Sequence, residues 1–416
     1  MGSSADAWMG FQYLKENIPL LKKYPGVNLL QGLYAGLPAV VVGTGPSLTK
    51  SLEQLKKLKD KALIIAADAS YKILLEAGIT PHFVCSLERE YDTKIFFENI
   101  AAHRPATALV AYPVVPHGVI EAFQGPKLFV YRNLRMHQYF DSQMPKGFLN
   151  SGHSVTHLAA SLADYLGCSQ IALIGQDLSF DPDKLSTHAE NIAYEKWSEA
   201  QSLQDLEAKL KEQGDHLVWA EGNEREKVPT RGYYMIFARE FAALQKIYKA
   251  ELINCTIGGL KIPRLKYQSL SETSKNWTTP SDLFERRDKI LSERREPTQL
   301  NLAPLLENLR QWQALLLENA QLIRFALEGK LAAPEKQIPT LISQARGIWE
   351  KAAEDHVMQA FGIELIGMPS IQLEIDWLKE NSEKPEAMKC LKIIDEFFRL
   401  MLLQIEKINA ELRPLA

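Results

Sequence analysis

The chain has 416 residues, of which 46% are hydrophobic and 24% charged, and its formal net charge is −3. This length predicts two or three domains, and the balanced charge predicts neither nucleic-acid binding nor a polybasic membrane anchor. No apolar run reaches the length of a membrane span and no signal peptide is evident, so we expect a cytoplasmic protein. The scattered cysteines, whose spacing predicts small buried thiols instead of disulfides or a zinc site, are Cys85, Cys168, Cys255 and Cys390.

Helical patterns are expected at both ends of the chain. Residues 1–35 are predicted to form a short N-terminal segment of one or two helices. Residues 275–416 carry apolar side chains at i, i+3, i+4 and i+7 spacing, which predicts a C-terminal helical domain of about four helices. The helical faces lie near 302–316, 336–360, 364–381 and 385–411. Such a bundle suits docking or assembly, including assembly into a homo-oligomer.

The region 36–274 alternates short apolar runs with amphipathic stretches. The expected strands are 38–43, 62–67, 82–86, 107–111, 127–131, 170–175 and 251–255. The expected helices are 48–59, 69–77, 91–101, 152–166 and 233–249. This alternation predicts βαβ units and therefore an α/β fold with a Rossmann-like, doubly wound, mostly parallel sheet. Residues 181–232 lack the alternation, and we interpret them as an insertion or lid.

A glycine-containing turn follows the first expected strand and consists of Gly43, Thr44, Gly45, Pro46 and Ser47. It departs from the dinucleotide fingerprint because a leucine follows it, at the position of the third glycine, and no P-loop motif occurs in the chain. A tight turn between a buried strand and a helix N-terminus favours an anionic group. The turn therefore predicts a nucleotide or phosphate site that is neither the dinucleotide-binding type nor a P-loop.

Polar residues also follow other expected strands, where a doubly wound sheet collects its ligands. Asp68 follows the second strand and could meet a ribose hydroxyl or a base, or serve only as a helix N-cap. Glu88 follows the third strand, either as a ligand of the site or as a solvated carboxylate. At the end of the sixth strand, Gly175, Gln176 and Asp177 form either a ligand loop or an ordinary cap.

Three further segments could contribute to this site. Asn150, Ser151 and Gly152 stand at the start of an expected helix, as a second phosphate cradle or as simple capping by Ser151. His188 lies in the irregular segment after the sixth strand, where a histidine can act as general base or acid, although most loop histidines do neither. The pair Asp181 and Asp183 matches the D-x-D pattern of a metal site, but its neighbours favour a turn.

Two other features have two interpretations each. His153 and His157 are four residues apart without a third zinc ligand, so we interpret His157 as a packing or surface residue. Gly258 and Gly259 follow the last strand and permit close backbone approach, either to a ligand or to a neighbouring loop.

Taken together, the motifs resemble the motility-accessory-factor (Maf) glycosyltransferases. The matching segments are 41–48, 64–68, 78–88, 150–155, 171–180, 187–189 and 254–260. That family transfers nonulosonic acids, such as pseudaminic or legionaminic acid, from CMP-sugars to Ser and Thr of flagellin. Its core is similar to bacterial sialyltransferases and is related to pterin diphosphokinase-like domains.

The resemblance implies a role for each matching residue. His188 corresponds to the catalytic histidine, and we expect it to take the proton from an acceptor hydroxyl in an inverting displacement. The residues implied to bind the nucleotide-sugar are Gly43, Thr44, Gly45, Pro46, Ser47, Asp68, Glu88, Asn150, Ser151, Gly152, Gly175, Gln176 and Asp177. The implied partners are a CMP-activated nonulosonic acid and a protein acceptor such as flagellin. No metal and no other cofactor is expected.

Two other functions remain open from the sequence. Archaeal pterin diphosphokinases resemble the same core and would need ATP and Mg²⁺, with Asp68 and Glu88 on the metal. The long helical region argues against that reading, because a small-molecule kinase has little need of a docking bundle. A non-catalytic module that binds a nucleotide-sugar or a flagellar protein is the third possibility.

Overall fold

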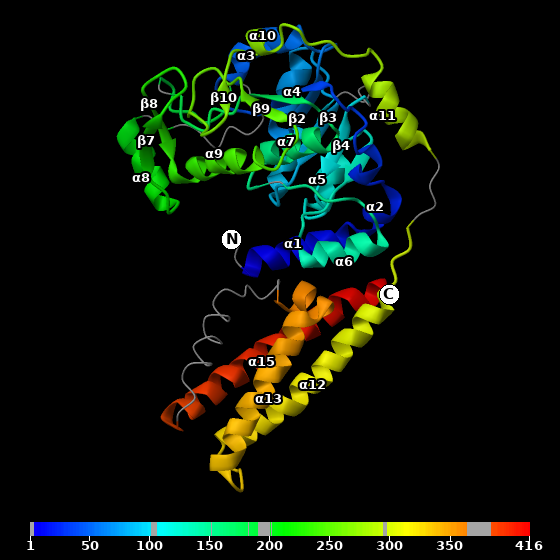
Figure 1. Cartoon of the computed structure of the whole chain (residues 1–416), viewed down its shortest axis with the longest axis vertical. Helices are drawn as coiled ribbons and strands as arrows, with labels where there is room; N and C mark the ends of the chain where they lie inside the picture. Colours follow the sequence, from blue (N-terminus) through cyan, green and yellow to red (C-terminus); the bar gives the residue numbers. More distant parts are fainter. Residues whose placement is uncertain are drawn as a thin grey trace. The chain divides into compact units, whose positions relative to one another are not determined.

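The computed structural model describes residues 4–100, 106–150, 152–181, 183–189, 200, 202–293, 298–363 and 384–416. The chain divides into two compact units (Figure 1). The helical unit consists of 1–22, 133–145 and 297–416, and the sheet unit consists of 23–132 and 146–296. The units therefore interleave along the chain, whereas the expected domain ranges 1–35, 36–274 and 275–416 follow one another in order.

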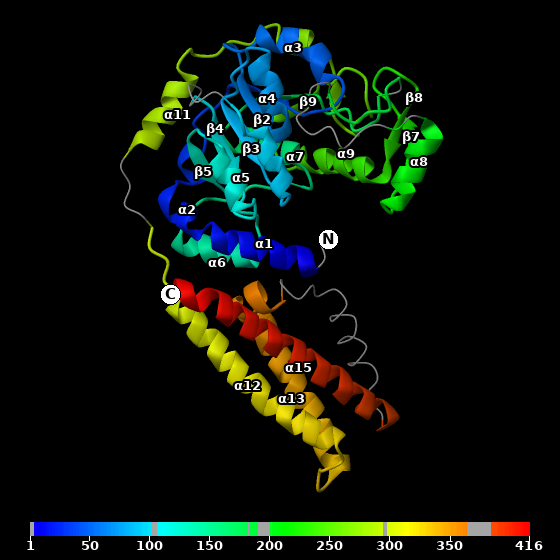
Figure 2. The ribbon, with the colours of Figure 1, turned by 180° about the vertical axis from the view of Figure 1, so that it is seen from behind.

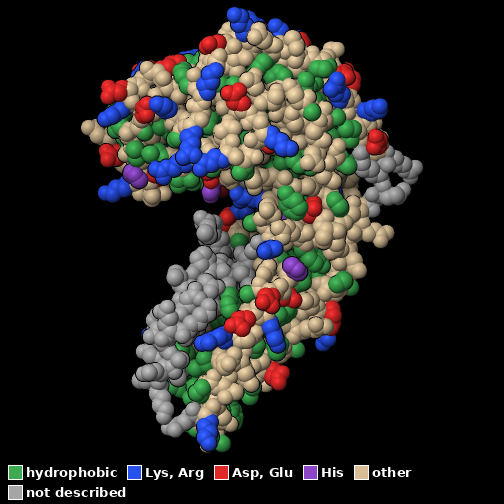
Figure 3. All heavy atoms as spheres, in the orientation of Figure 1, with side chains coloured by type: hydrophobic (Ala, Val, Ile, Leu, Met, Phe, Trp, Pro, Cys, Tyr) green, Lys and Arg blue, Asp and Glu red, His purple; other side chains and the backbone are tan. Residues whose placement is uncertain are grey.

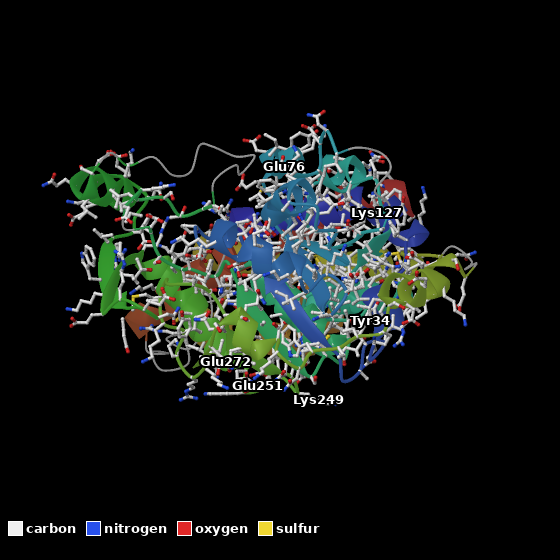
Figure 4. The ribbon with its side chains drawn as sticks, turned by 90° about the horizontal axis from the view of Figure 1, so that it is seen from above. Tyr34, Glu76, Lys127, Lys249, Glu251 and Glu272 are labelled. Carbon is white, nitrogen blue, oxygen red and sulfur yellow. The ribbon has the colours of Figure 1, made fainter. Side chains whose placement is uncertain are left out.

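An eight-stranded parallel sheet forms the core of the sheet unit, in the order β10-β9-β6-β1-β2-β3-β4-β5. Its strands are β1 (Pro38–Val42), β2 (Leu63–Ala67), β3 (Phe83–Ser86), β4 (Ala108–Ala111), β5 (Lys127–Phe129), β6 (Gln170–Ile174), β9 (Glu251–Asn254) and β10 (Lys266–Tyr267). Lys127 and Glu251 lie toward different ends of this sheet (Figure 4). The predicted α/β class, the mostly parallel sheet and the seven predicted strands are confirmed.

Helices cover both faces of the sheet (Figures 1 and 2). The helices of this unit that flank the sheet or follow it are α3 (Leu48–Lys56), α4 (Asp68–Glu76), α5 (His117–Ala122), α7 (Val155–Tyr165), α9 (Gly232–Leu244), α10 (Leu270–Thr273) and α11 (Leu283–Ser292). Strands β1 and β2 are buried along their whole length, as expected for parallel strands covered on both faces. Alternate side chains such as Val41 and Ile65 share one core with Leu158 of α7.

Three predicted elements differ in the structure. The helix expected at 91–101 is a 3-10 helix at Tyr91–Phe96, with residues 101–105 outside the described residues. The segment 181–232, expected to be irregular, contains α8 (Leu203–Glu212) and an antiparallel hairpin of β7 (Leu217–Glu221) and β8 (Lys227–Arg231) in its described part. The hairpin is anchored where β6 ends, because Thr230 Oγ1 donates to the Leu178 carbonyl at 2.6 Å. The helix expected at 152–166 begins three residues later, at Val155.

The helical unit joins segments from distant parts of the chain. Its long helices are α1 (Ser4–Glu16), α6 (Arg135–Gln143), α12 (Ala303–Leu327), α13 (Pro334–Glu354) and α15 (Lys384–Leu412), and the short α2 (Ile18–Lys23) ends at the boundary of the two units. Phe361, in the π-helical turn Met358–Ile363, contacts the rings of Phe11 and Tyr139 at centroid distances of 6.3 and 5.5 Å. The helix expected at 364–381 lies outside the described residues.

The surface and the cysteines agree with the composition. On the face shown in Figure 3, basic and acidic side chains are interspersed over both units. All four cysteines are buried free thiols, as predicted. Among the described residues, no helix combines the length and apolarity needed to cross a membrane.

The buried arginine Arg287 ties α11 to the sheet. Its guanidinium donates to the carbonyl oxygens of His82 at 2.6 Å and Ala106 at 2.5 Å, and it also pairs with Asp288. Nearby, the Tyr34 hydroxyl donates to the Leu283 carbonyl at 2.7 Å (Figure 4 labels Tyr34). These contacts explain why the segment around α11 belongs to the sheet unit.

We predict that Arg287→Met lowers the free energy of unfolding of the sheet unit by about 2–4 kcal/mol, because buried carbonyl groups lose their donor. Urea denaturation followed by circular dichroism measures this change. Arg286→Met is the matched control, since the Arg286 pair with Asp282 at 3.0 Å is at the surface and is worth under about 1 kcal/mol. Equal losses in the two variants would contradict the role assigned to Arg287.

Candidate functional site

The candidate site lies where the strand order of the sheet reverses. The strands after β1 continue from β2 to β5 on one side, whereas β6 and β9 lie on the other side. Ligands of open α/β sheets bind beyond the carboxyl ends of the strands at such a switch point. The turns that follow β1 and β6 contain the predicted residues 43–47 and 175–177. The sheet therefore brings these two groups of predicted site residues together.

Direct hydrogen bonds join the β1 turn to the β6 turn. The Gly43 amide donates to the Ile174 carbonyl at 2.9 Å, and the Gly45 amide donates to the Gly175 carbonyl at 2.8 Å. A Cβ on Gly43 would lie 2.5 Å from the Gly175 oxygen, and a Cβ on Gly45 would lie 2.8 Å from the same oxygen. Both glycines are therefore required by the neighbouring turn, whatever the ligand.

Asp177 places a carboxylate at the N-terminus of α3. Its Oδ1 accepts from the Ser47 amide at 3.1 Å, and its Oδ2 accepts from the Ser47 hydroxyl at 2.8 Å. The side chain is only 6% exposed, and this burial raises the pKa of Asp177 to about 6. Since the amides of Gly43, Gly45 and Ser47 already have protein acceptors, the turn does not present them to a phosphate in this conformation.

The turn after β9 packs against the same place. A Cβ on Gly259 would lie 2.6 Å from the Asp177 carbonyl oxygen, and the Leu260 amide donates to that oxygen at 2.7 Å. Of the two interpretations of the glycine pair, close approach to a neighbouring loop is the one that the structure shows.

Gln176 connects three elements of the site. Its amide donates to Thr256 Oγ1 at 3.0 Å, and its side-chain Oε1 accepts from Thr156 Oγ1 at 3.0 Å. Through these contacts the end of β6 is bonded to the segment after β9 and to the first turn of α7. The roles of Thr156 and Thr256 could not be predicted, because an isolated threonine carries no local sequence signal of such a role.

The loop before α7 differs from the predicted helix start. Ser154 is the N-cap, with its hydroxyl accepting from the His157 amide at 3.3 Å. Ser151 lies outside the described residues, so its predicted role stays a prediction. Asn150 is exposed, and the Gly152 carbonyl accepts from the Arg132 guanidinium. The Asn150 carbonyl accepts from the Ser161 hydroxyl of α7.

His153, in the loop before α7, and His157, in the first turn of α7, have different surroundings. His157 is buried, with Nε2 3.1 Å from the Phe237 carbonyl and Nδ1 2.8 Å from the Ser154 hydroxyl. Burial lowers the pKa of His157 to about 4, so it is a neutral packing residue, which is one of the two roles expected for it. His153 pairs with Glu240 of α9, which also accepts from the His153 amide at 3.0 Å.

Asp68 and Glu88 form a pair of perturbed carboxyl groups at the ends of β2 and β3. Asp68 is 3% exposed and accepts from Ser86 Oγ at 2.8 Å and from the Ala69 amide at 2.9 Å. Burial raises the pKa of Asp68 to about 6. Burial, followed by the charges of Asp68 and Glu90, raises the pKa of Glu88 to about 7. Carboxyl groups with strongly shifted pKa values are found more often at functional sites than elsewhere on a protein.

His188 is tied to the β1 turn. The amide of the next residue, Ala189, donates to the Thr44 carbonyl at 2.8 Å. His188 Nδ1 lies 2.7 Å from Thr187 Oγ1. Burial lowers the pKa of His188 to about 4, so the imidazole is neutral near pH 7. The structure thus bonds the segment that contains the predicted histidine to Thr44.

The D-x-D pattern forms a turn, which is the interpretation favoured from the sequence. Asp181 Oδ1 accepts from the amides of Asp183 at 2.8 Å and Lys184 at 2.9 Å. In the described parts of the chain, no group of three or more His, Cys, Asp or Glu is arranged to hold a metal ion.

Comparisons of this chain with known proteins found a family model and a solved structure that match it. Residues 12–183 match the family model described as 6-hydroxymethylpterin diphosphokinase MptE-like. The structure matches that of the Maf glycosyltransferase from Magnetospirillum magneticum AMB-1 with a TM-score of 0.64 and 17% identity. The chain has the fold of a Maf glycosyltransferase. The resemblance predicted from the motifs is thereby confirmed at the level of the fold.

The extent of these matches differs. The Maf comparison covers 99% of this chain and 61% of the solved chain. An uncharacterized protein of Treponema pallidum (strain Nichols) is 32% identical over 53 residues, which are 13% of this chain and 25% of that protein. This chain therefore spans about three fifths of the solved Maf chain, and its match covers a quarter of the Treponema relative.

We predict that the contribution of Asp177 to the stability of the sheet unit falls as the pH rises from about 4 to about 7. The pKa of Asp177 is about 6 when folded, against about 3.9 in an unfolded chain, so the folded state holds the extra proton over this range. Asp177→Asn keeps an acceptor for the Ser47 amide but cannot ionise, and it should reduce the decline by about 1–3 kcal/mol. Urea denaturation at pH 4.5 and pH 8 measures the difference.

The exposed Asp183 supplies the control for this pH dependence, since Asp183→Asn should keep the wild-type decline. An Asp177→Asn variant whose stability falls as steeply as that of the wild type would show that Asp177 is not the titrating group.

Proposed function

We propose that this protein is a glycosyltransferase that moves a nonulosonic acid from a CMP-activated donor to Ser or Thr hydroxyls of a protein. The observation that carries the proposal is the extent of the match to the Maf glycosyltransferase, which includes 99% of this chain and therefore both units. The pterin diphosphokinase-like family model accounts only for residues 12–183. A helical unit in the same chain as a nucleotide site suits an enzyme with a protein acceptor, and flagellin is the acceptor that we propose.

The donor would bind beyond the carboxyl ends of β1, β2 and β6. Asp68 follows β2, about 20 residues after the glycine turn, where an acidic side chain holds ribose hydroxyls in related sheets. Because the Asp177 carboxylate faces the start of α3, we place the donor phosphate over Thr44, on the side of His188. A phosphate placed at the start of α3 would be repelled by the negative charge of the Asp177 carboxylate.

Transfer at this site would depend on positioning and proton exchange. A single inverting displacement requires the acceptor hydroxyl to approach the sugar carbon on the face opposite the phosphate. His188 is neutral and bonded through its segment to the β1 turn, so we assign it the proton exchange with the acceptor hydroxyl. The charge that develops on the departing phosphate has to be met by nearby donors.

We predict that His188→Ala lowers the transfer rate by about 10²–10⁴-fold, the usual contribution of general acid–base catalysis, while CMP still binds. Mass spectrometry of a candidate acceptor incubated with the protein and a CMP-nonulosonate measures transfer, and calorimetry measures CMP binding. His216→Ala is the control, because His216 is 75% exposed. Full turnover by His188→Ala would refute the assigned role.

Pyrophosphoryl transfer to a pterin is the second candidate function. It is favoured by the family match over 12–183 and by the carboxyl groups of Asp68 and Glu88, which follow the neighbouring strands β2 and β3 and are of the type that Mg²⁺ prefers. Thermal shifts separate the candidates, since a bound ligand raises the unfolding temperature. Stabilisation by CMP without metal supports glycosyl transfer, and a response to ATP that requires Mg²⁺ supports the kinase. Stabilisation by CMP without any transfer supports a binding module.

A further inference from the structure

The side-chain amide of Gln176 lies against the first residue of the β1 turn. A Cβ on Gly43 would clash with Gln176 Nε2, so the glycine leaves room for this nitrogen. Among the described residues, Nε2 donates only to the Gly175 carbonyl, at 3.4 Å, which is near the limit of a hydrogen bond. Because an amide nitrogen carries two N–H donors, at least one of them is available to a ligand at this place.

Thr156, in the first turn of α7, holds the oxygen of the same amide. Its hydroxyl donates to Gln176 Oε1 at 3.0 Å, and the two side chains are only 7% and 6% exposed. The reverse orientation of the amide would bring Oε1 to the Gly175 carbonyl, where two acceptors would face each other. Thr156 and the Gly175 carbonyl therefore both direct Nε2 to the β1 turn.

The hydroxyl next to Thr156 has a different acceptor. His157 is neutral, and its Nε2 donates to the Phe237 carbonyl at 3.1 Å, so its Nδ1 accepts from the Ser154 hydroxyl at 2.8 Å. Ser154 Oγ lies 3.0 Å from Thr156 Oγ1 but already accepts from the His157 amide. Since the proton of Ser154 is used at His157, the proton of Thr156 is left for Gln176.

We propose that Thr156 is a positioning residue that holds the Gln176 amide so that Nε2 donates to a phosphate oxygen of the bound nucleotide. The amides of Gly43, Gly45 and Ser47 have acceptors within the protein, so this side chain supplies a donor that the backbone of the turn does not. The inference rests on the proposed function only in placing a nucleotide phosphate at the β1 turn.

Gln176 is a neutral donor, which suits a group whose charge changes during transfer. Negative charge grows on the phosphate as its bond to the sugar breaks, and a donor that is already oriented stabilises this charge without rearrangement. Loss of the Thr156 hydroxyl should therefore weaken the binding of a nucleotide, whereas the binding of the nucleoside without its phosphate should not change.

The test is calorimetry of the full chain with CMP and with cytidine. Thr156→Val keeps the shape of the side chain but removes the donor, and it should lower the ratio of CMP affinity to cytidine affinity about 10-fold, the usual worth of a hydrogen bond to a charged group. Gln176→Met, which has no N–H donor, should lower the ratio at least as much. Thr156→Ser keeps the hydroxyl and should restore most of the ratio.

Thr107→Val is the matched control. The buried Thr107 hydroxyl donates to the Pro81 carbonyl at 2.8 Å, just before β4 and therefore at the opposite edge of the sheet. This variant loses a buried hydrogen bond of the same kind, so it reports any general effect on the fold. Its ratio of CMP affinity to cytidine affinity should equal that of the wild type.

An unchanged ratio in Thr156→Val, or an equal loss of affinity for CMP and cytidine, would overturn the proposal. If the wild type binds ATP but not CMP, the proposed glycosyl transfer fails, and the same comparison with ATP and adenosine decides the role of Thr156. If neither nucleotide binds more tightly than its nucleoside, the proposed function and the role of Thr156 both fail.

Discussion

The docking of the β1 turn onto the β6 turn is the contact on which the candidate site depends. Two glycines let the backbones approach, and Asp177 joins its own turn to Ser47 at the start of α3. The parallel pairing of β1 with β6 alone would bring the strand ends together, but it would not determine how the turns face each other. Their close packing places Thr44, the half-exposed residue of the first turn, beside the His188 segment.

Two buried carboxyl groups, one of them part of this contact, give the site its electrostatic character. Burial raises the pKa of Asp177 and Asp68 to about 6, so both carboxyl groups gain or lose a proton near pH 6. The charge of a bound phosphate can therefore change their protonation. An anion near them favours their protonated forms, and a protonated carboxyl group can donate to a phosphate or a sugar hydroxyl. The site therefore suits a ligand that combines hydroxyl groups with a phosphate.

The sheet could be predicted from the sequence because each buried strand is a short apolar run that ends in a turn. Such a run and its turn are recognised from neighbouring residues alone. Residues at strand ends, such as Asp68 and Gln176, were found for the same reason. The roles of the glycines at 43 and 45 could not be predicted, since they depend on a turn that is more than a hundred residues away. The start of α7 was misplaced because Ser151 and Ser154 carry the same capping signal, and only the folded loop selects Ser154. The hairpin of β7 and β8 was missed because Pro229 lowers the strand signal within β8.

A crystal structure of the protein with bound CMP would show directly where the nucleotide lies. We expect the ribose hydroxyls at Asp68 and the phosphate beside Thr44 and His188, with Asp177 still bonded to Ser47. A phosphate bound instead to the amides of Gly43 and Gly45, with the two turns separated, would contradict it. So would a nucleotide bound away from the carboxyl ends of β1 and β6.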